Sequence, residues 1–460
     1  MISTIKKIFL LIIFVFLLLN TFFSTGLSTD CWWHLSSGKK IIQNRGLPST
    51  DDFYCAGGNR WYSHEWLFDV LAFVSYKKFG ITGLKIICSV VFLLTIIFIF
   101  LNSYFISNKN LTISFLVSFI SSIFLIPFLE ERPQVFTMLF FSIFAFVTNF
   151  KFSKKLLIYY FLLIPLLLLW VNIQYTILAG IYIFILNSVF YIKECENKKE
   201  QIIIYSTLFI FFIMVAILNP EGFKAFVFFE KDMGIKSYIK EWQGIFSAGG
   251  VKFFIYQILY IISGLLFLLF FILKFKENKK EMALRILLII APFLVAPVFF
   301  KRAIMFFAIL FPYILYLTDQ IKIKIKRLYL IYLLLFLIFI LITGIKMNVQ
   351  YPYRIIEYIK NNVKNECVLT SFEIGGFAEY FIYPENKVFL NGRLNVPFEI
   401  WMEYSQIYYA EGDFNEIIKK YGIKYFLVPN FSPIFKYFIL NKTKPIFMEN
   451  NYGLFFIKYL

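Results

Sequence analysis

Charged residues are scarce in this chain of 460 residues, at 16% of the total, whereas hydrophobic residues make up 60%. A soluble domain usually carries about 25% charged and about 45–50% apolar residues. The shortage of charge therefore excludes a soluble enzyme, a disordered protein and a fibrous repeat, and it indicates a polytopic membrane protein. Glycine and proline are also few, with 21 and 14 residues, so low-complexity linkers are not expected.

Acidic residues are the scarcer charged type, with 28 against 46 Lys and Arg, which gives a net charge of +18. No basic amphipathic segment or aromatic binding module accompanies this excess, so nucleic acid is not an expected partner. The excess instead favours cytoplasmic loops rich in Lys and Arg that lie beside anionic lipid headgroups. The lipid bilayer is thus the first expected partner.

Long apolar runs dominate the chain, and a membrane-spanning helix needs about 20 such residues. They predict eleven spans, near 5–25, 84–103, 110–129, 134–150, 155–171, 175–193, 202–218, 252–274, 283–299, 302–318 and 328–346. The first run follows two lysines but lacks a cleavage site of small residues, so we expect an uncleaved anchor. Lysine-rich connections recur on one side, which predicts a multi-pass protein of the cell (inner) membrane with a cytoplasmic N-terminus and an extracytoplasmic C-terminal domain.

Three polar segments are expected on the outer face: 26–83, 219–251 and 347–460. The residue pattern of segment 347–460 predicts helices near 352–363, 397–410 and 413–421. It predicts strands near 367–371, 387–391, 424–429, 445–448 and 454–458. The predicted fold class is an all-α polytopic membrane domain over 1–346, which includes the first two outer segments. A small C-terminal α/β domain over 347–460 follows it.

Cysteine is rare, with five residues, and no pair has the spacing of metal ligands. Cys31 and Cys55 fall in the same outer segment, where an oxidising compartment would permit a disulfide between them. Two unpaired thiols are an equally good interpretation.

Histidine is rarer still, and both histidines, His34 and His64, lie in the first outer segment. The same segment holds Trp32, Trp33 and Glu65, and helical patterns near 32–42 and 67–74. This clustering predicts contacts to a substrate, because loops on a rigid scaffold commonly carry function. The alternative is a pair of helices in the membrane interface, anchored there by tryptophan.

Asp30 lies where the first predicted span reaches the outer segment. A carboxylate shielded by the following tryptophans could have a raised pKa and accept a proton from a substrate hydroxyl. Asp30 is therefore our candidate catalytic residue. The competing interpretation is a capping residue for the helix that follows.

Asp51 and Asp52 are adjacent carboxylates after a Ser-Thr pair. Paired carboxylates can bind a divalent cation together with water and phosphate oxygens, so a divalent metal ion is one candidate cofactor here. Turn chemistry explains the same four residues equally well.

Four further polar residues interrupt apolar regions at the outer ends of predicted spans: Arg132, Gln134, Asn172 and Arg302. Ionisable residues at such points are costly and therefore suggest function. Arginine can hold a phosphate through paired hydrogen bonds, and the amides can bind a sugar. A solvated turn and hydrogen bonds that join helices are the alternatives.

An ordered set of motifs runs through most of the chain. It comprises Asp30-Cys31-Trp32-Trp33-His34-Leu35, Gly46-Leu47-Pro48, Asp51-Asp52-Phe53, His64-Glu65-Trp66-Leu67, Arg132-Pro133-Gln134, Trp170-Val171-Asn172, Asn219-Pro220, Glu241-Trp242, Gly375-Gly376, Gly392-Arg393-Leu394 and Tyr421-Gly422-Ile423. The set resembles a large family of bacterial multi-spanning proteins described as similar to dolichyl-phosphate-mannose-protein mannosyltransferases, within the C-type glycosyltransferase (GT-C) superfamily. The chain departs from the family at two places. The family commonly has His or Gly near Ile173–Tyr175, and it commonly has Asp at the position of Asn391.

The resemblance implies a GT-C-like membrane glycosyltransferase that takes a sugar from a polyprenyl-phosphate donor on the outer face. Its acceptor, a glycan, lipid or protein hydroxyl, would be activated by an acidic residue at the position of Asp30. Two other functions fit the same residues: a transporter or flippase of a lipid-linked saccharide, and a non-enzymatic scaffold of envelope assembly. Charge at the outer ends of the spans, rather than in mid-membrane, favours the enzyme over the transporter.

Overall fold

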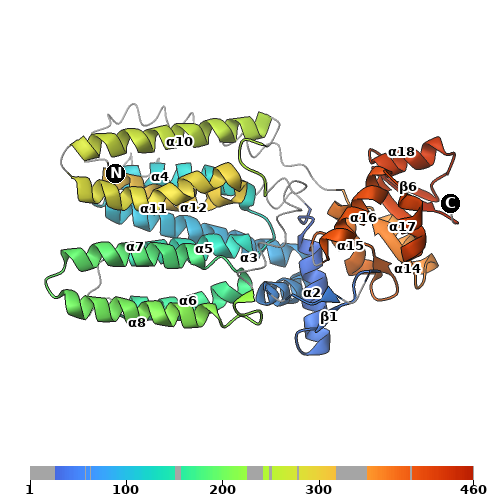
Figure 1. Cartoon of the computed structure of the whole chain (residues 1–460), viewed down its shortest axis with the longest axis horizontal. Helices are drawn as coiled ribbons and strands as arrows, with labels where there is room; N and C mark the ends of the chain where they lie inside the picture. Colours follow the sequence, from blue (N-terminus) through green and yellow to red (C-terminus); the bar gives the residue numbers. More distant parts are fainter. Residues whose placement is uncertain are drawn as a thin grey trace. The chain divides into compact units, whose positions relative to one another are not determined.

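The computed structural model describes residues 26–56, 59–62, 64–150, 157–224, 242–247, 251–276, 279–317, 350–393 and 396–458. The predicted spans 5–25 and 328–346 lie outside these ranges. The described chain forms two compact units (Figure 1). The helical unit contains residues from Lys85 to Leu317, and the mixed unit combines 26–84 with 350–458. The first outer segment therefore groups with the C-terminal segment rather than with the helices.

The helical unit consists of apolar helices. They are the later part of α3 (Trp66–Ile106), α4 (Leu111–Leu125), α5 (Gln134–Thr148), α6 (Leu157–Ile173), α7 (Leu178–Glu194), α8 (Lys198–Ala216), α10 (Val251–Lys276), α11 (Lys280–Phe299) and α12 (Ile304–Leu310), with 3-10 turns at Ile126–Phe128, Lys301–Ala303 and Phe311–Leu317. Within the described residues, five helices are long and apolar enough to cross a membrane. The count of eleven spans is thus not confirmed. The predicted span 302–318 is a short helix followed by a 3-10 turn that contains Pro312, because proline lacks the N–H that an α-helix needs.

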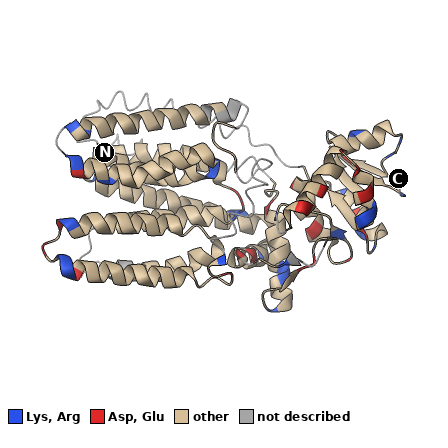
Figure 2. Cartoon of the chain, viewed as in Figure 1, with Lys and Arg blue, Asp and Glu red and all other residues tan. Residues whose placement is uncertain are grey.

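Lysines gather at one end of the helical unit (Figure 2). They lie at the α7–α8 connection, at Lys193, Lys198 and Lys199, and at the α10–α11 connection, at Lys274, Lys276 and Lys280. Cytoplasmic loops collect Lys and Arg, and the cytoplasmic position of this end stays a prediction.

The mixed unit is built on a five-stranded sheet. Its strands are β3 (Cys367–Thr370), β4 (Lys387–Val388), β5 (Ile423–Pro429), β6 (Phe447–Glu449) and β7 (Tyr452–Phe456), in the order β4-β3-β5-β7-β6. β4, β3 and β5 are parallel, and β7 is antiparallel to both β5 and β6. All five predicted strands are present at their predicted places.

The helices of the mixed unit are only partly as predicted. α14 (Tyr353–Asn362), α16 (Phe398–Tyr409) and α17 (Phe414–Tyr421) match the three expected helices, whereas α15 (Phe372–Ile382) and α18 (Pro433–Leu440) were not predicted. α15 contains two glycines, and its helical signal in the sequence is weak because glycine is a weak helix former. They serve close packing: a Cβ at Gly375 would lie 2.4 Å from the Leu390 oxygen, and one at Gly376 would lie 3.0 Å from the Trp33 nitrogen.

The first outer segment supplies α2 (Cys31–Asn44), a small hairpin of β1 (Thr50–Asp51) and β2 (Asn59–Arg60), and the first turns of α3. α2 is buried in the mixed unit: Trp32 is 1% exposed, and its ring contacts Phe377, Tyr351 and Tyr380 at 5.1–5.6 Å. The interpretation of Trp32 as a membrane-interface anchor is therefore wrong, because its ring belongs to this core.

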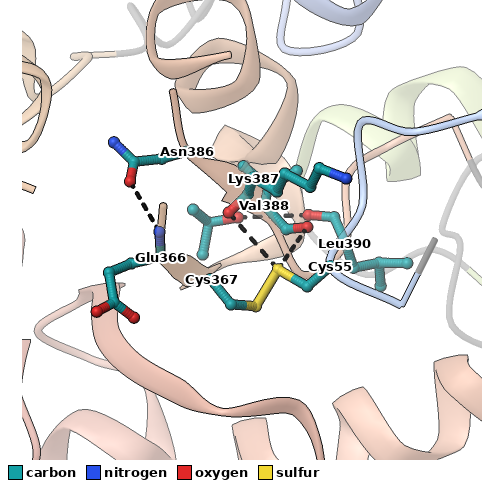
Figure 3. Close-up of a disulfide and its surroundings, with 8 residues drawn as sticks. Cys55, Glu366, Cys367, Asn386, Lys387, Val388 and Leu390 are labelled. Atoms are coloured by element: carbon teal, nitrogen blue, oxygen red, sulfur yellow. Dashed lines mark hydrogen bonds between the residues drawn. A yellow bond between two sulfur atoms is a disulfide. The ribbon is translucent and has the colours of Figure 1, made fainter. Parts of the chain in front are cut away.

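Residues 53–55 extend the sheet at the edge of β4. The Cys55 N–H donates to the Val388 oxygen at 3.0 Å, and the Val388 N–H donates to the Phe53 oxygen at 3.3 Å. Cys55 also forms a disulfide with Cys367, 312 residues away (Figure 3). Neither expected state of Cys55 is correct, since it is not unpaired and its partner is not Cys31, which is buried and forms no disulfide.

Removal of this disulfide should destabilise the mixed unit. Because a disulfide restricts the unfolded chain, we expect the Cys55→Ser/Cys367→Ser variant to lose about 2–5 kcal/mol of unfolding free energy. Thermal unfolding of the full chain in detergent measures the loss, with Cys195→Ser as the control, since Cys195 is a free cysteine outside this unit. Equal melting temperatures for the two variants, or no Cys55–Cys367 peptide in a non-reducing digest, would contradict the linkage.

Candidate functional site

A turn that follows β4 organises the polar residues of the mixed unit. It contains Asn391, whose side chain is buried and whose Oδ1 accepts from the Tyr54 hydroxyl at 2.7 Å and from the Arg393 N–H at 2.8 Å. The Nδ2 of Asn391 donates to Oε2 of Glu379 in α15. One amide therefore joins the first outer segment, α15 and the turn.

Arg393 forms a buried ion pair with Asp51. Its Nη1 donates to Asp51 Oδ2 at 3.0 Å and its Nη2 to the Tyr62 oxygen at 3.2 Å, while the guanidinium lies 3.6 Å from the centre of the Trp61 ring. The other oxygen of Asp51 accepts from the Phe53 N–H at 3.3 Å. The ion pair is nearly inaccessible, with side-chain exposures of 5% and 0%.

Asp52 bonds to a different cation. It forms an ion pair with Lys40, and its Oδ2 accepts from the Tyr383 hydroxyl at 2.8 Å. Burial lowers the pKa of Lys40 to about 8, although Asp51 acts in the opposite direction. The two adjacent carboxylates thus serve two separate ion pairs. Among the described residues, no group of three His, Cys, Asp or Glu could hold a metal, and metal binding by Asp51 and Asp52 stays a prediction.

Glu379 is a functional candidate that the sequence analysis missed. It is 1% exposed, and its Oε2 accepts from the Asn391 side chain. It lines a small pocket with Ser36, Lys40 and Tyr383. Burial, followed by the nearby Asp51 charge, raises the pKa of Glu379 to about 8. A carboxyl group that is protonated at neutral pH can donate a proton or a hydrogen bond.

The raised pKa of Glu379 predicts how stability depends on pH. Because the folded chain holds this proton more tightly than the unfolded chain, the stabilisation should be lost as pH rises from about 4.5 to about 8. Glu379→Gln stays neutral, so we expect it to melt like the parent at pH 5 and at a higher temperature than the parent at pH 8.5. Thermal unfolding at both pH values, with the exposed Glu357→Gln as control, tests this. The same parent-to-variant difference at both pH values would mean that Glu379 ionises normally.

Asp30 lies beside the same turn. A Cβ built on Gly392 would be 2.9 Å from Asp30 Oδ1, so a larger residue there would require the carboxylate to shift. Asp30 precedes α2, but its side chain makes no capping hydrogen bond to that helix. The geometry therefore does not support the capping interpretation, and catalysis by Asp30 remains a proposal.

Both histidines have acidic neighbours in the mixed unit. His34 is buried, and its Nδ1 shares a 2.6 Å hydrogen bond with Asp69 Oδ1. His64 Nε2 lies 3.8 Å from Glu65 Oε2, and both side chains are partly exposed. Their roles as substrate contacts remain predictions, with His64 and Glu65 the more accessible pair.

The other predicted contacts belong to the helical unit, near the ends of helices opposite to the lysine-rich end. Arg132 Nη1 lies 3.5 Å from Glu130 Oε2, and Arg302 lies in the 3-10 turn after α11. Asn172 donates to the Leu168 oxygen at 2.9 Å and to the Leu218 oxygen at 3.3 Å, which favours a role in joining helices. Gln134 is buried at the first residue of α5.

Two sequence motifs lie near the missed residues. Gly375-Gly376 and Gly392-Arg393 belong to the motif set, yet nothing in the sequence shows that α15 brings Glu379 to the turn of Arg393. Lys40 gave no signal, because one lysine on an amphipathic helix normally faces solvent.

Comparison with solved structures shows the fold. The chain is similar to the archaeal oligosaccharyltransferase AglB from Archaeoglobus fulgidus, solved in complex with an inhibitory peptide and a dolichol-phosphate, with a TM-score of 0.59 and 11% identity over 93% of this chain and 70% of that chain. A second structure, of the Archaeoglobus fulgidus oligosaccharyltransferase tethered to an acceptor peptide, gives a TM-score of 0.62 and 11% identity over 92% and 69%. The apo form of that enzyme gives a TM-score of 0.61.

Searches by sequence give a different outcome. No protein-family model matches the chain, and no curated protein matches it. At 11% identity the structural likeness concerns the fold alone. The chain has a GT-C-like fold, as the motif resemblance predicts.

Proposed function

We propose that this GT-C-like chain is a membrane glycosyltransferase that moves a sugar from a polyprenyl-phosphate donor to an acceptor on the outer face of the cell membrane. The observation that carries the proposal is the fold, which extends over 92–93% of the chain in comparisons with an oligosaccharyltransferase. One of those structures contains a dolichol-phosphate and another an acceptor peptide. A lipid-linked donor and a separate acceptor are the corresponding substrates here.

The proposed reaction assigns the base to Asp30. Its carboxylate takes the proton of the acceptor hydroxyl while the hydroxyl oxygen bonds to the anomeric carbon of the sugar. The bond between that carbon and the phosphate oxygen breaks, and polyprenyl phosphate leaves with the electron pair. No nucleotide is needed, because the donor is already activated.

The Cys55–Cys367 disulfide supports an extracytoplasmic site. Disulfides persist in oxidising compartments and are rare in the cytosol. Because this disulfide links the first outer segment to the C-terminal sheet, both should lie outside. The lysines at one end of the helical unit agree with a cytoplasmic position for that end.

Arg132 and Arg302 are the proposed contacts for the donor phosphate. A guanidinium binds phosphate through two parallel hydrogen bonds, which lysine cannot reproduce. Arg132 is only 12% exposed at its side chain, so a phosphate there would be partly shielded from water.

A transfer assay with separate donors tests the proposal. Membranes that contain the full chain would be incubated with radiolabelled polyprenyl-phosphate mannose, glucose or N-acetylglucosamine, and label would be counted in material that is not lipid-soluble. Transfer from one donor, absent from membranes without the chain, is the expected result. Movement of labelled lipid between leaflets without transfer would identify a flippase, and neither activity would indicate a scaffold.

A further inference from the structure

A small pocket lies between α2 and α15 of the mixed unit, and most of the residues that line it are polar. Its α2 side consists of Ser36, Lys39, Lys40 and Gln43, which follow the i, i+3, i+4 and i+7 spacing of one helix face. A helix face that packs against another helix is normally apolar. Gln43 is exposed, so the pocket can be reached from solvent. A polar face at this helix contact makes the pocket a candidate for ligand binding.

The acidic groups beside the pocket leave no excess negative charge. Asp52 pairs with Lys40, and Asp51 pairs with Arg393. Glu379 lines the pocket from α15, and burial, followed by the Asp51 charge, raises its pKa to about 8. Glu379 is therefore mostly protonated at neutral pH, and the two ion pairs cancel.

Two further cations add positive charge to the surroundings of the pocket. Lys39 and Lys387 form no ion pair within the described part of the chain. Lys39 lines the pocket, is half-buried, and lies 5.5 Å from the centre of the Tyr380 ring. The charge of Lys387, in β4, acts on Lys40. The unbalanced positive charge favours an anionic ligand.

The available donors select a carboxylate among the anions. Oε2 of Glu379 accepts from the Asn391 amide, so the proton of Glu379 belongs on Oε1. A carboxylate can accept from this O–H and from the Lys39 ammonium through its two oxygens. A phosphate is bulkier and has more oxygens than so small a pocket can satisfy. A neutral group would leave the charge of Lys39 without an anion.

The mouth of the pocket favours a sugar as the carrier of this carboxylate. Tyr380 and Gln43 line the pocket, and both are at least partly exposed. An aromatic ring can cover the apolar face of a sugar, and an amide can both donate to and accept from its hydroxyls.

We propose that the pocket between α2 and α15 binds the carboxylate of an acidic sugar, with Lys39 as its cation and Glu379 as its hydrogen-bond donor. The site recognises a substituent, and none of its residues is the proposed base. Membership of the acidic sugar in the acceptor rests on the proposed function, but the binding itself can be measured without transfer.

Protection of lysines from reductive methylation tests the site in the full chain, held in nanodiscs at pH 7. The probe is methyl β-D-glucuronide, and the methylation of each lysine is quantified by mass spectrometry. The glucuronide should protect Lys39 severalfold and leave Lys436, an exposed lysine of the same unit, unchanged. Methyl β-D-glucoside, the neutral analogue, should protect neither lysine.

Three results of this experiment would overturn the proposal. They are no protection of Lys39 by the glucuronide, equal protection by the neutral glucoside, and stronger protection by N-acetyl-L-glutamate. The last result would identify an acidic protein segment, rather than a sugar, as the ligand.

Two matched substitutions measure the contribution of Lys39. Lys39→Gln should raise the dissociation constant of the glucuronide about tenfold or more, as expected from loss of a hydrogen bond to a charged group. Lys436→Gln should leave it unchanged. Saturation-transfer NMR of the glucuronide gives both constants, and equal melting temperatures show that both variants are folded. Equal dissociation constants would contradict the site.

The affinity for the glucuronide should fall as pH rises through about 8. Glu379 then loses the proton that it donates and gains a charge that repels the ligand, and Lys40, whose pKa burial lowers to about 8, loses its charge. Both changes weaken binding. The other ionisable groups that act on this pair or line the pocket are Lys39, Asp51, Asp52, Tyr380, Tyr383, Lys387 and Arg393.

Glu379→Gln separates the two causes of this pH dependence. Glutamine keeps a hydrogen-bond donor and cannot ionise, so the variant should bind the glucuronide at pH 7 and lose less affinity than the parent between pH 7 and pH 9. An equal loss in the variant and the parent would show that Glu379 does not contact the ligand.

The outcomes for this site and for the glycosyltransferase are distinguishable. Sugar transfer without protection of Lys39 would leave the glycosyltransferase standing and remove the carboxylate site. Protection of Lys39 in a chain without transfer activity would support the site and contradict the glycosyltransferase.

Discussion

Replacement of Asp30 by asparagine should lower the rate of sugar transfer by about 10²–10⁴-fold, which is the usual contribution of a general base. Asparagine keeps the size of the side chain and removes its basicity. Because Asp30 makes no capping bond to α2, the melting temperature should change little. The measurement is the initial transfer rate in membranes with matched protein levels.

Asp413 provides the matched control for this substitution. It also precedes a helix, α17, also lacks a capping hydrogen bond, and is exposed in the same unit. Asp413→Asn should therefore retain the full transfer rate. If Asp30→Asn turns over like the parent, Asp30 is not the base, and Glu65 and Glu379 become the next carboxylates to replace.

Replacement of Arg393 by methionine should destabilise the mixed unit by about 3–5 kcal/mol, because it removes the cation that is bonded to the buried Asp51 carboxylate. Methionine keeps much of the length of the side chain, so the loss is mainly that of the ion pair and of the cation over Trp61. Chemical denaturation of the full chain in detergent, followed by near-ultraviolet circular dichroism, measures the change.

Two further variants identify the cause. Lys420→Met removes one partner of an ion pair with Glu403 in which the lysine side chain is 56% exposed, and exposed pairs contribute only about 0–1 kcal/mol. The Asp51→Asn/Arg393→Met double variant should recover part of the loss, since neither charge then stays unpaired. Equal losses for Arg393→Met and Lys420→Met would show that Asp51 is solvated.

Local patterns were enough to predict much of the fold. The strands of the mixed unit are short apolar runs bounded by polar residues, and α14 and α17 show regular apolar spacing, so their local sequence agrees with their final state. The membrane spans were harder to count. A run of suitable composition such as 302–318 becomes a helix and a 3-10 turn because of one proline.

The candidate site was less predictable than the fold. Asp30, Trp33, Asp51 and Asp52 could be selected because rare polar and aromatic residues cluster in one outer segment. Arg393 and Glu379 lie more than 300 residues further along the chain. Their proximity to that segment depends on pairing of residues 53–55 with β4 and on α15 packing against α2, and neither contact has a local sequence signal.

Composition and apolar periodicity are local properties of the chain, and they alone specify a membrane protein with a helical part and a small α/β part. The Cys55–Cys367 disulfide, the Asp51–Arg393 ion pair and the placement of Asp30 beside Gly392 are contacts between distant segments. They arise only when the first outer segment joins the C-terminal sheet, because burial of Trp32 and edge pairing at β4 bring those segments together. Tertiary structure therefore decided which of the polar residues became buried partners, since desolvation requires every buried charge to meet a compensating group.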